Sequence, residues 1–180
     1  MSRPLPRWIT IGLPVVVLTA AGLAGVAALL EGGEPEPVGT DTAPVPTETT
    51  GRDGVLSFEV RSADCGFENV IAEERIPADG QFCLATVGVG AAVSGTTERL
   101  DLGCQYLITR ERERYVADEE ATLAGVDPRP FRDGIRPGTA TEVEVTYDIP
   151  TDAAAVAVEL HSSCDSEGAR LALVFEGASR

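Results

Sequence analysis

His161 is the only histidine of the chain and therefore the one imidazole available as a general base. Ser162, Ser163 and Asp165 follow it, so a serine–histidine–carboxylate triad would have to be assembled here. Neighbouring side chains at the end of a strand point apart, and the chain has no GxSxG motif. We therefore interpret His161 as a strand-end residue near solvent and expect no catalytic residue.

An acidic stretch could bind a metal ion, because carboxylate oxygens are the ligands that Ca²⁺ prefers. Its members are Asp118, Glu119, Glu120 and Asp127. The EF-hand pattern is absent and the spacing is irregular, which favours a solvated acidic surface, no metal site and no cofactor. The alternative is a Ca²⁺-binding sensor or hydrolase, in which residues 118–127, His161 and Asp165 would converge on one pocket.

The four cysteines are Cys65, Cys83, Cys104 and Cys164. An even number in an oxidising compartment predicts two disulfides, for which three pairings are possible. Cys65 closes one predicted strand and Cys83 opens the next, so we favour Cys65–Cys83 together with Cys104–Cys164. A metal or redox site is the alternative, but the chain has no CxxC motif and no common zinc spacing.

The charge of the chain excludes one class of partner. It has 29 acidic and 14 basic residues, a net charge of −15, and every basic residue is an arginine. A surface this acidic repels phosphate backbones, so we expect no nucleic-acid partner.

The N-terminus predicts a membrane anchor. Residues 8–30 carry no charge and are long enough, as a helix, to cross a bilayer. Arg3 and Arg7 precede them and Trp8 lies at the expected interface, so the N-terminus should be cytoplasmic and the rest extracellular. The alternative is a signal peptide cleaved after Ala28, which would release a secreted protein.

The next segment, residues 31–53, is rich in proline, threonine and glutamate and predicts a disordered linker. The folded domain should therefore occupy residues 54–180.

Within this domain the hydrophobic pattern has a period of two, which is typical of strands. Alternating runs occupy residues 56–61, 81–89, 100–109, 115–117, 142–149, 156–160 and 171–175. Turn signals such as Ala78-Asp79-Gly80 separate them, residues 110–114 (RERER) resemble a solvated turn, and residues 118–124 could form a helical turn. The pattern predicts an all-β, immunoglobulin-like antiparallel sandwich.

Several segments resemble a bacterial domain-of-unknown-function family with a telokin-like, secreted-antigen immunoglobulin-like fold. They are GVLSFEVRSADCG, GQFCLATVGVG, CQYLITRERERYVAD, FRDGIRPGTATEVEVTYDIP and AVELHSS, within residues 54–175. The resemblance implies an anchored extracellular sandwich without an agreed enzymatic activity. It places Cys65 and Cys83 where many members carry a cysteine pair and makes Cys104–Cys164 an extra bridge.

The sequence thus predicts a membrane-tethered extracellular binding or scaffold module rather than an enzyme. Its ligand is not identified, and a protein partner at the cell envelope is the expected type. A plain structural spacer is the remaining alternative.

Overall fold

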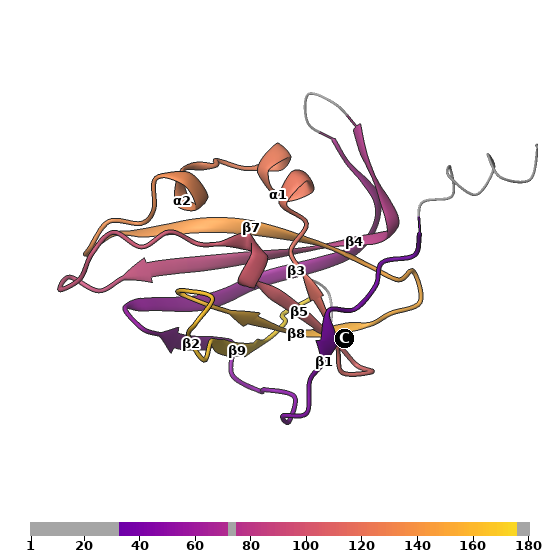
Figure 1. The fold of residues 1–180 in the computed structure, drawn as a ribbon, viewed down its shortest axis with the longest axis horizontal. Helices are drawn as coiled ribbons and strands as arrows, with labels where there is room; N and C mark the ends of the chain where they lie inside the picture. The colour runs from indigo at the N-terminus through magenta and orange to yellow at the C-terminus, as the bar shows by residue number, and fades with distance from the viewer. Residues whose placement is uncertain (1–32, 72–74, 176–180) are drawn as a thin grey trace, which may run out of the picture. The chain divides into compact units, whose positions relative to one another are not determined.

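The computed structural model describes residues 33–71 and 75–175, which form a sandwich of two antiparallel sheets (Figure 1). The five-stranded sheet has the order β1 (Gly39–Thr40), β6 (Glu113–Val116), β5 (Tyr106–Thr109), β8 (Ala155–Leu160) and β9 (Ala169–Ala172). The four-stranded sheet has the order β2 (Thr50–Asp53), β3 (Leu56–Ile71), β4 (Arg75–Ala91) and β7 (Ala140–Ile149). The predicted antiparallel β-sandwich is confirmed.

The predicted membrane segment, residues 8–30, lies outside the described residues. No helix within residues 33–71 and 75–175 is long and apolar enough to cross a bilayer.

The core lies between the two sheets and consists of the inward-facing residues of the alternating runs. Leu56, Phe58 and Val60 of β3 are buried, whereas Ser57 and Glu59 between them are partly exposed. Because successive side chains of a strand point to opposite faces, this alternation gives each sheet one apolar face. The other strands complete the core with Val87, Val89, Leu107, Tyr115, Val143, Val145, Tyr147, Ile149, Val158 and Leu171.

The hairpin of β3 and β4 is longer than the sequence pattern predicted and projects from the sandwich (Figure 1). The turn predicted at residues 78–80 is wrong, because these residues belong to β4. The carboxylate of Asp148 accepts hydrogen bonds from the backbone N–H groups of Asp79 (2.6 Å) and Gly80 (3.1 Å). A Cβ at Gly80 would collide with the carbonyl oxygen of Ile149, so the glycine is needed for close contact and not for a turn.

The predicted disordered linker is wrong for residues 33–53, where the structure has two edge strands. β1 pairs with β6, and β2 pairs with β3. Residues 41–49, called the strap below, join the two sheets, and Asp41 at its start forms an ion pair with Arg170 of β9. Edge pairing uses backbone groups, which proline-rich acidic sequence still offers, and it needs little side-chain burial.

A short helix lies beside β7, the edge strand of the four-stranded sheet (Figure 1). The predicted helical turn is confirmed as α1 (Glu119–Gly125), whose first turn is capped by Asp118, with Ala121 N–H donating to its carboxylate at 2.8 Å. The sequence pattern did not predict α2 (Arg129–Arg132), which buries Phe131, or the 3₁₀ helix η2 (Leu102–Cys104).

Candidate functional site

All four cysteines are in disulfides, with the pairing that strand order favoured. Cys65 and Cys83 face each other across β3 and β4, with their Cα atoms 4.0 Å apart. Cys104 of η2 is bonded to Cys164 in the loop after β8. No thiolate is therefore left to act as a nucleophile or a metal ligand.

His161 is buried, with 6% of its surface exposed, so the prediction that it lies near solvent is wrong. Its Nε2 lies 2.9 Å from a carboxylate oxygen of Glu159, and its Nδ1 lies 3.1 Å from the carbonyl oxygen of Ser166. The loop between β8 and β9 folds back over the ring, and Gly168 lies so close that a Cβ there would be 2.6 Å from Nε2. The edge of Tyr106 covers another side.

These contacts resemble a triad but do not have its geometry. The hydroxyl of Ser166 lies 3.3 Å from His161 Nδ1, yet it donates its hydrogen bond to the carbonyl of Ser163 at 2.6 Å. Nδ1 is itself directed at the Ser166 carbonyl, so it is not free to remove a proton from a serine. Ser162, a triad candidate from the sequence, donates its hydroxyl to Asp53 instead.

Glu159 is the centre of a charged network on the outer face of the five-stranded sheet. Its carboxylate accepts from Arg114 of β6 at 2.7 Å and contacts Arg170 of β9 at 3.5 Å, in addition to His161. Only 11% of the Glu159 side chain is exposed. Because Asp41 of the strap pairs with Arg170, the network joins three strands and the strap, and we interpret it as structural.

Asp53 is a second buried carboxylate at the end of β2. Burial acts to raise its pKa, but hydrogen bonds from the backbone N–H and hydroxyl of Ser162 and from Gly168 N–H outweigh it and hold the pKa of Asp53 below its ordinary value. The charged form is therefore the one that the fold stabilises.

The carboxylates of residues 118–127 do not gather into a metal site. Asp118 caps α1 and Asp127 pairs with Arg129, while Glu119 and Glu120 are exposed. Among the described residues, Asp101 with Cys104 and Cys164 is the one group of three candidate ligands within 4.8 Å, and both cysteines are in a disulfide. The pocket required by the sensor or hydrolase alternative is not formed by these side chains.

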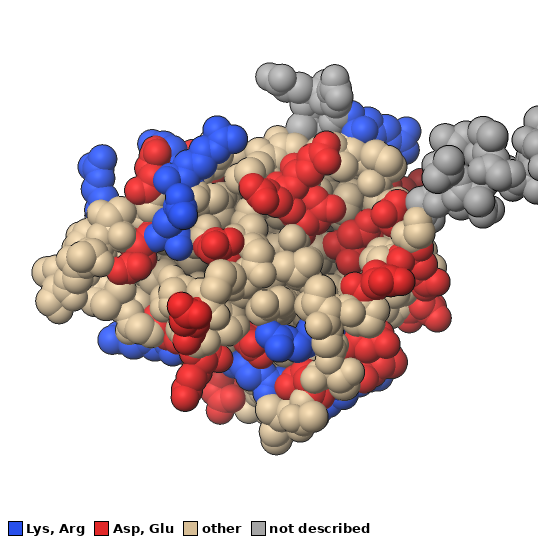
Figure 2. All heavy atoms as spheres, in the orientation of Figure 1, with Lys and Arg blue, Asp and Glu red and all other residues tan. Residues whose placement is uncertain are grey.

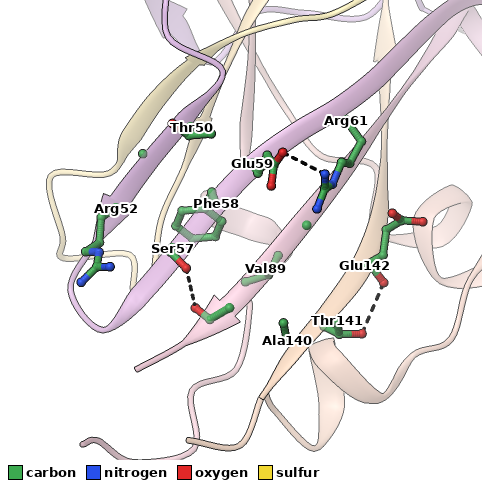
Figure 3. A pocket seen from close by; sticks show the side chains of 13 residues that line it. Thr50, Arg52, Ser57, Phe58, Glu59, Arg61, Val89, Ala140, Thr141 and Glu142 are labelled. Atoms are coloured by element: carbon green, nitrogen blue, oxygen red, sulfur yellow. Dashed lines mark hydrogen bonds and ion pairs between the residues drawn. The ribbon is translucent and has the colours of Figure 1, made fainter. Parts of the chain in front are cut away.

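An open groove lies on the outer face of the four-stranded sheet. It has a volume of about 770 Å³ and crosses all four strands, with Thr50 and Arg52 on β2 and Thr141 and Glu142 on β7 (Figure 3). A second hollow of about 320 Å³ shares Arg52 with it and extends past the end of the sheet to exposed Val93. We call the larger hollow the glycine groove.

Its floor is formed by two glycines of β4, Gly88 and Gly90. In the register of the sheet Gly88 lies between Glu59 and Glu142, and Gly90 between Ser57 and Ala140. Two glycines two residues apart lie on the same face of a strand, so both expose backbone where side chains would otherwise stand. Glycine weakens a strand interior and often marks the close approach of a ligand.

Side chains of β3 lie over the two glycines of the floor. The hydroxyl of Ser57 donates to the carbonyl of Gly90 at 3.2 Å. A bulge between Val60 and Ser62 leaves Arg61 out of the ladder, and its guanidinium lies over Gly88, where an added Cβ would be 3.3 Å from its Nε. Glu59 holds this guanidinium through an ion pair of 2.8 Å (Figure 3).

The groove was not predicted from the sequence, although VGVG at residues 87–90 was a signal for it. The pattern predicted the strand and placed Val87 and Val89 on one face, with the glycines on the other, but it did not show which residues of the neighbouring strands lie beside them.

Figure 2 shows the charge on one face of the molecule, where carboxylates gather toward the end at which the described chain begins. Some arginines gather over α2 on the same face. An acidic surface of this kind repels polyanions. The arginines form small positive patches within it.

Comparisons with models of known protein families, with curated proteins and with solved structures find no match to this chain. The family resemblance and the immunoglobulin-like topology therefore stay predictions from the sequence. The function has to be argued from the side chains of this chain.

Proposed function

We propose that the protein is a ligand-binding module with an immunoglobulin-like sandwich, held outside the plasma membrane by residues 8–30, and that its ligand binds in the glycine groove. Two disulfides are typical of an oxidising compartment, and the charge-free segment after Arg7 is typical of an anchor with a cytoplasmic N-terminus.

The glycine groove is the observation that carries this proposal. Its volume of about 770 Å³ falls within the range of small-molecule and peptide sites. Gly88 and Gly90 bring no side chain of their own to its floor, where a Cβ at Gly90 would lie only 2.9 Å from the Ser57 hydroxyl. Hydroxyl and charged side chains surround the floor and can orient a ligand.

The groove offers binding without turnover. Its lining contains hydroxyls but no histidine and no cysteine, and the Ser57 hydroxyl is engaged with the Gly90 carbonyl. A serine without an adjacent base is a weak nucleophile. Binding without chemistry is therefore the function that these residues support best.

Adding a side chain to the floor of the glycine groove tests whether a ligand binds there. Gly88→Val places a β-branched side chain on the floor, where the nearest atoms belong to the flexible end of Arg61, so the fold should be kept. Gly125→Ala, at the end of α1, is the matched control, because its Cβ meets only Val70 at an ordinary 3.8 Å. Saturation-transfer-difference NMR with a chemically diverse fragment library is recorded on each full chain in detergent micelles.

We expect a set of fragments that bind the wild type and the Gly125→Ala variant and lose their signal with Gly88→Val. Fragments that bind all three proteins equally would place the site elsewhere and overturn the proposal. An absence of bound fragments for a folded wild type would also contradict it.

A further inference from the structure

Two charged side chains on opposite walls of the glycine groove have no ionic partner. Arg52 of β2 and Glu142 of β7 are both exposed, and neither forms an ion pair among the residues that the structure describes. Figure 3 shows them on opposite sides, with β3 and β4 between them. Three strand spacings of about 4.8 Å separate the two walls by about 14 Å.

The other charges of the groove are already paired. Arg61 and Glu59 neutralise each other at 2.8 Å. A ligand in the groove therefore meets one unpaired positive charge at the β2 wall and one unpaired negative charge at the β7 wall. The complementary ligand carries an anionic group and a cationic group on opposite ends.

The lining also indicates the chemical class of the ligand. The one aromatic residue, Phe58, is 2% exposed, so no ring is presented on which a nucleobase could stack. Hydroxyls of Thr50 and Thr141 offer partners for the amide groups of a peptide. An extended peptide covers about 14 Å in roughly four residues, at about 3.3 Å each.

We infer that the glycine groove takes a short extended peptide, with a carboxylate at Arg52 and a cationic group at Glu142. This inference rests on the proposed function, and it adds the ligand class and the direction in which the ligand lies. The charges of Arg52 and Glu142 on the two walls select the peptide. The glycine floor is the surface on which the peptide lies.

Changing the charges of the peptide, and then those of the groove walls, tests the inference. The probes are four fluorescently labelled, otherwise identical tetrapeptides: Glu-Ser-Val-Lys, Gln-Ser-Val-Gln, Glu-Ser-Val-Glu and Lys-Ser-Val-Lys. Their dissociation constants are measured by fluorescence anisotropy with the full chain in detergent micelles. The zwitterionic probe should bind the wild type about tenfold more tightly than the neutral probe, because two exposed ion pairs contribute about threefold each.

Reversing the charge on one wall of the groove should change which peptide binds most tightly. Arg52→Glu leaves two negative walls and should favour Lys-Ser-Val-Lys, whereas Glu142→Arg should favour Glu-Ser-Val-Glu. Arg132→Glu and Glu120→Arg make the same charge changes at exposed positions outside the groove and should leave the preference of the wild type unchanged.

Equal affinity for all four probes, or no exchange of preference, would overturn the inference. So would tight binding of the zwitterionic probe to Gly88→Val. If no tetrapeptide binds but fragments still bind in a manner that Gly88→Val abolishes, the ligand class is wrong and the proposed function stands. If neither tetrapeptides nor fragments bind, both are wrong.

Discussion

Asp53 and Ser162, 109 positions apart in the chain, are joined by two hydrogen bonds to one carboxylate oxygen. Ser162 donates its backbone N–H at 2.6 Å and its hydroxyl at 2.7 Å. Gly168 N–H reaches the other oxygen at 3.3 Å, so the end of β2 is tied to the whole loop between β8 and β9. The described residues before Gly54, 33–53, are thus joined to the sandwich at their end.

The first prediction concerns acid stability. The pKa of Asp53 is lower in the folded protein than its ordinary value of 3.8, so the folded state holds this proton less tightly. Its contribution to stability is complete above the ordinary pKa and is lost as the pH falls through the folded-state pKa. Asp53→Asn should cost about 1–2 kcal/mol at pH 7, and the difference from the wild type should shrink below about pH 4.

Urea unfolding at pH 7, 5, 4 and 3 measures this difference. Asp165→Asn, an exposed carboxylate of the same loop, is the control and should follow the wild type throughout. A difference that stays constant from pH 7 to pH 3 would refute the role of the Asp53 charge.

The Glu159 network gives a second prediction. Glu159→Gln leaves Arg114 and His161 without their carboxylate partner, although Arg170 keeps Asp41, and the removal of one partner from a buried ion pair is costly. The free energy of unfolding at pH 7 should fall by about 3 kcal/mol. Glu120→Gln, exposed on α1, should change it by less than about 0.5 kcal/mol. Equal effects of the two substitutions would show that the network does not stabilise the fold.

A third prediction compares two buried tyrosines. The hydroxyl of Tyr147 has no hydrogen-bond partner among the described residues, whereas that of Tyr115 donates to Glu113 at 2.8 Å. Tyr147→Phe should therefore keep or raise stability by up to about 1 kcal/mol, and Tyr115→Phe should lower it by about 1 kcal/mol. Denaturant unfolding measures both changes in stability. If Tyr147→Phe lowers the free energy of unfolding by more than about 1 kcal/mol, the Tyr147 hydroxyl has a hydrogen-bond partner in the folded protein.

The anchor proposed at residues 8–30 predicts where the full chain is found and how long it is. Protein recovered from the membrane fraction should have the intact mass of the uncleaved chain, and external protease should digest the domain in whole cells. A soluble product that begins after Ala28 would establish the cleaved, secreted form instead.

Strand periodicity and cysteine position predicted much of the fold. Residues 142–149 alternate clearly and form nearly all of β7 (Ala140–Ile149), because one face of that strand packs on the core. Cys65 and Cys83 were expected to be neighbours because Cys65 closes one predicted strand and Cys83 opens the next, and they are directly opposite.

Features that depend on distant partners were not predictable in the same way. The strap is held by contacts such as Asp41 with Arg170, 129 positions away, which local composition cannot reveal. His161 is buried because Glu159 and Gly168 close around it, although the local sequence is polar. The glycine groove depends on which residues of β3 and β7 lie beside Gly88 and Gly90, and this follows only from the pairing of the strands.

The most direct test of the binding groove is a graded series at one position. The tightest ligand from the fragment screen is titrated against the full-length wild type and the variants Gly88→Ala, Gly88→Val and Gly88→Leu, with thermal unfolding recorded for each. The dissociation constant should rise with each larger side chain, by tenfold or more for the largest folded variant, on the order of what 1.4 kcal/mol produces. An unchanged dissociation constant in folded variants would show that the ligand does not lie on the glycine floor.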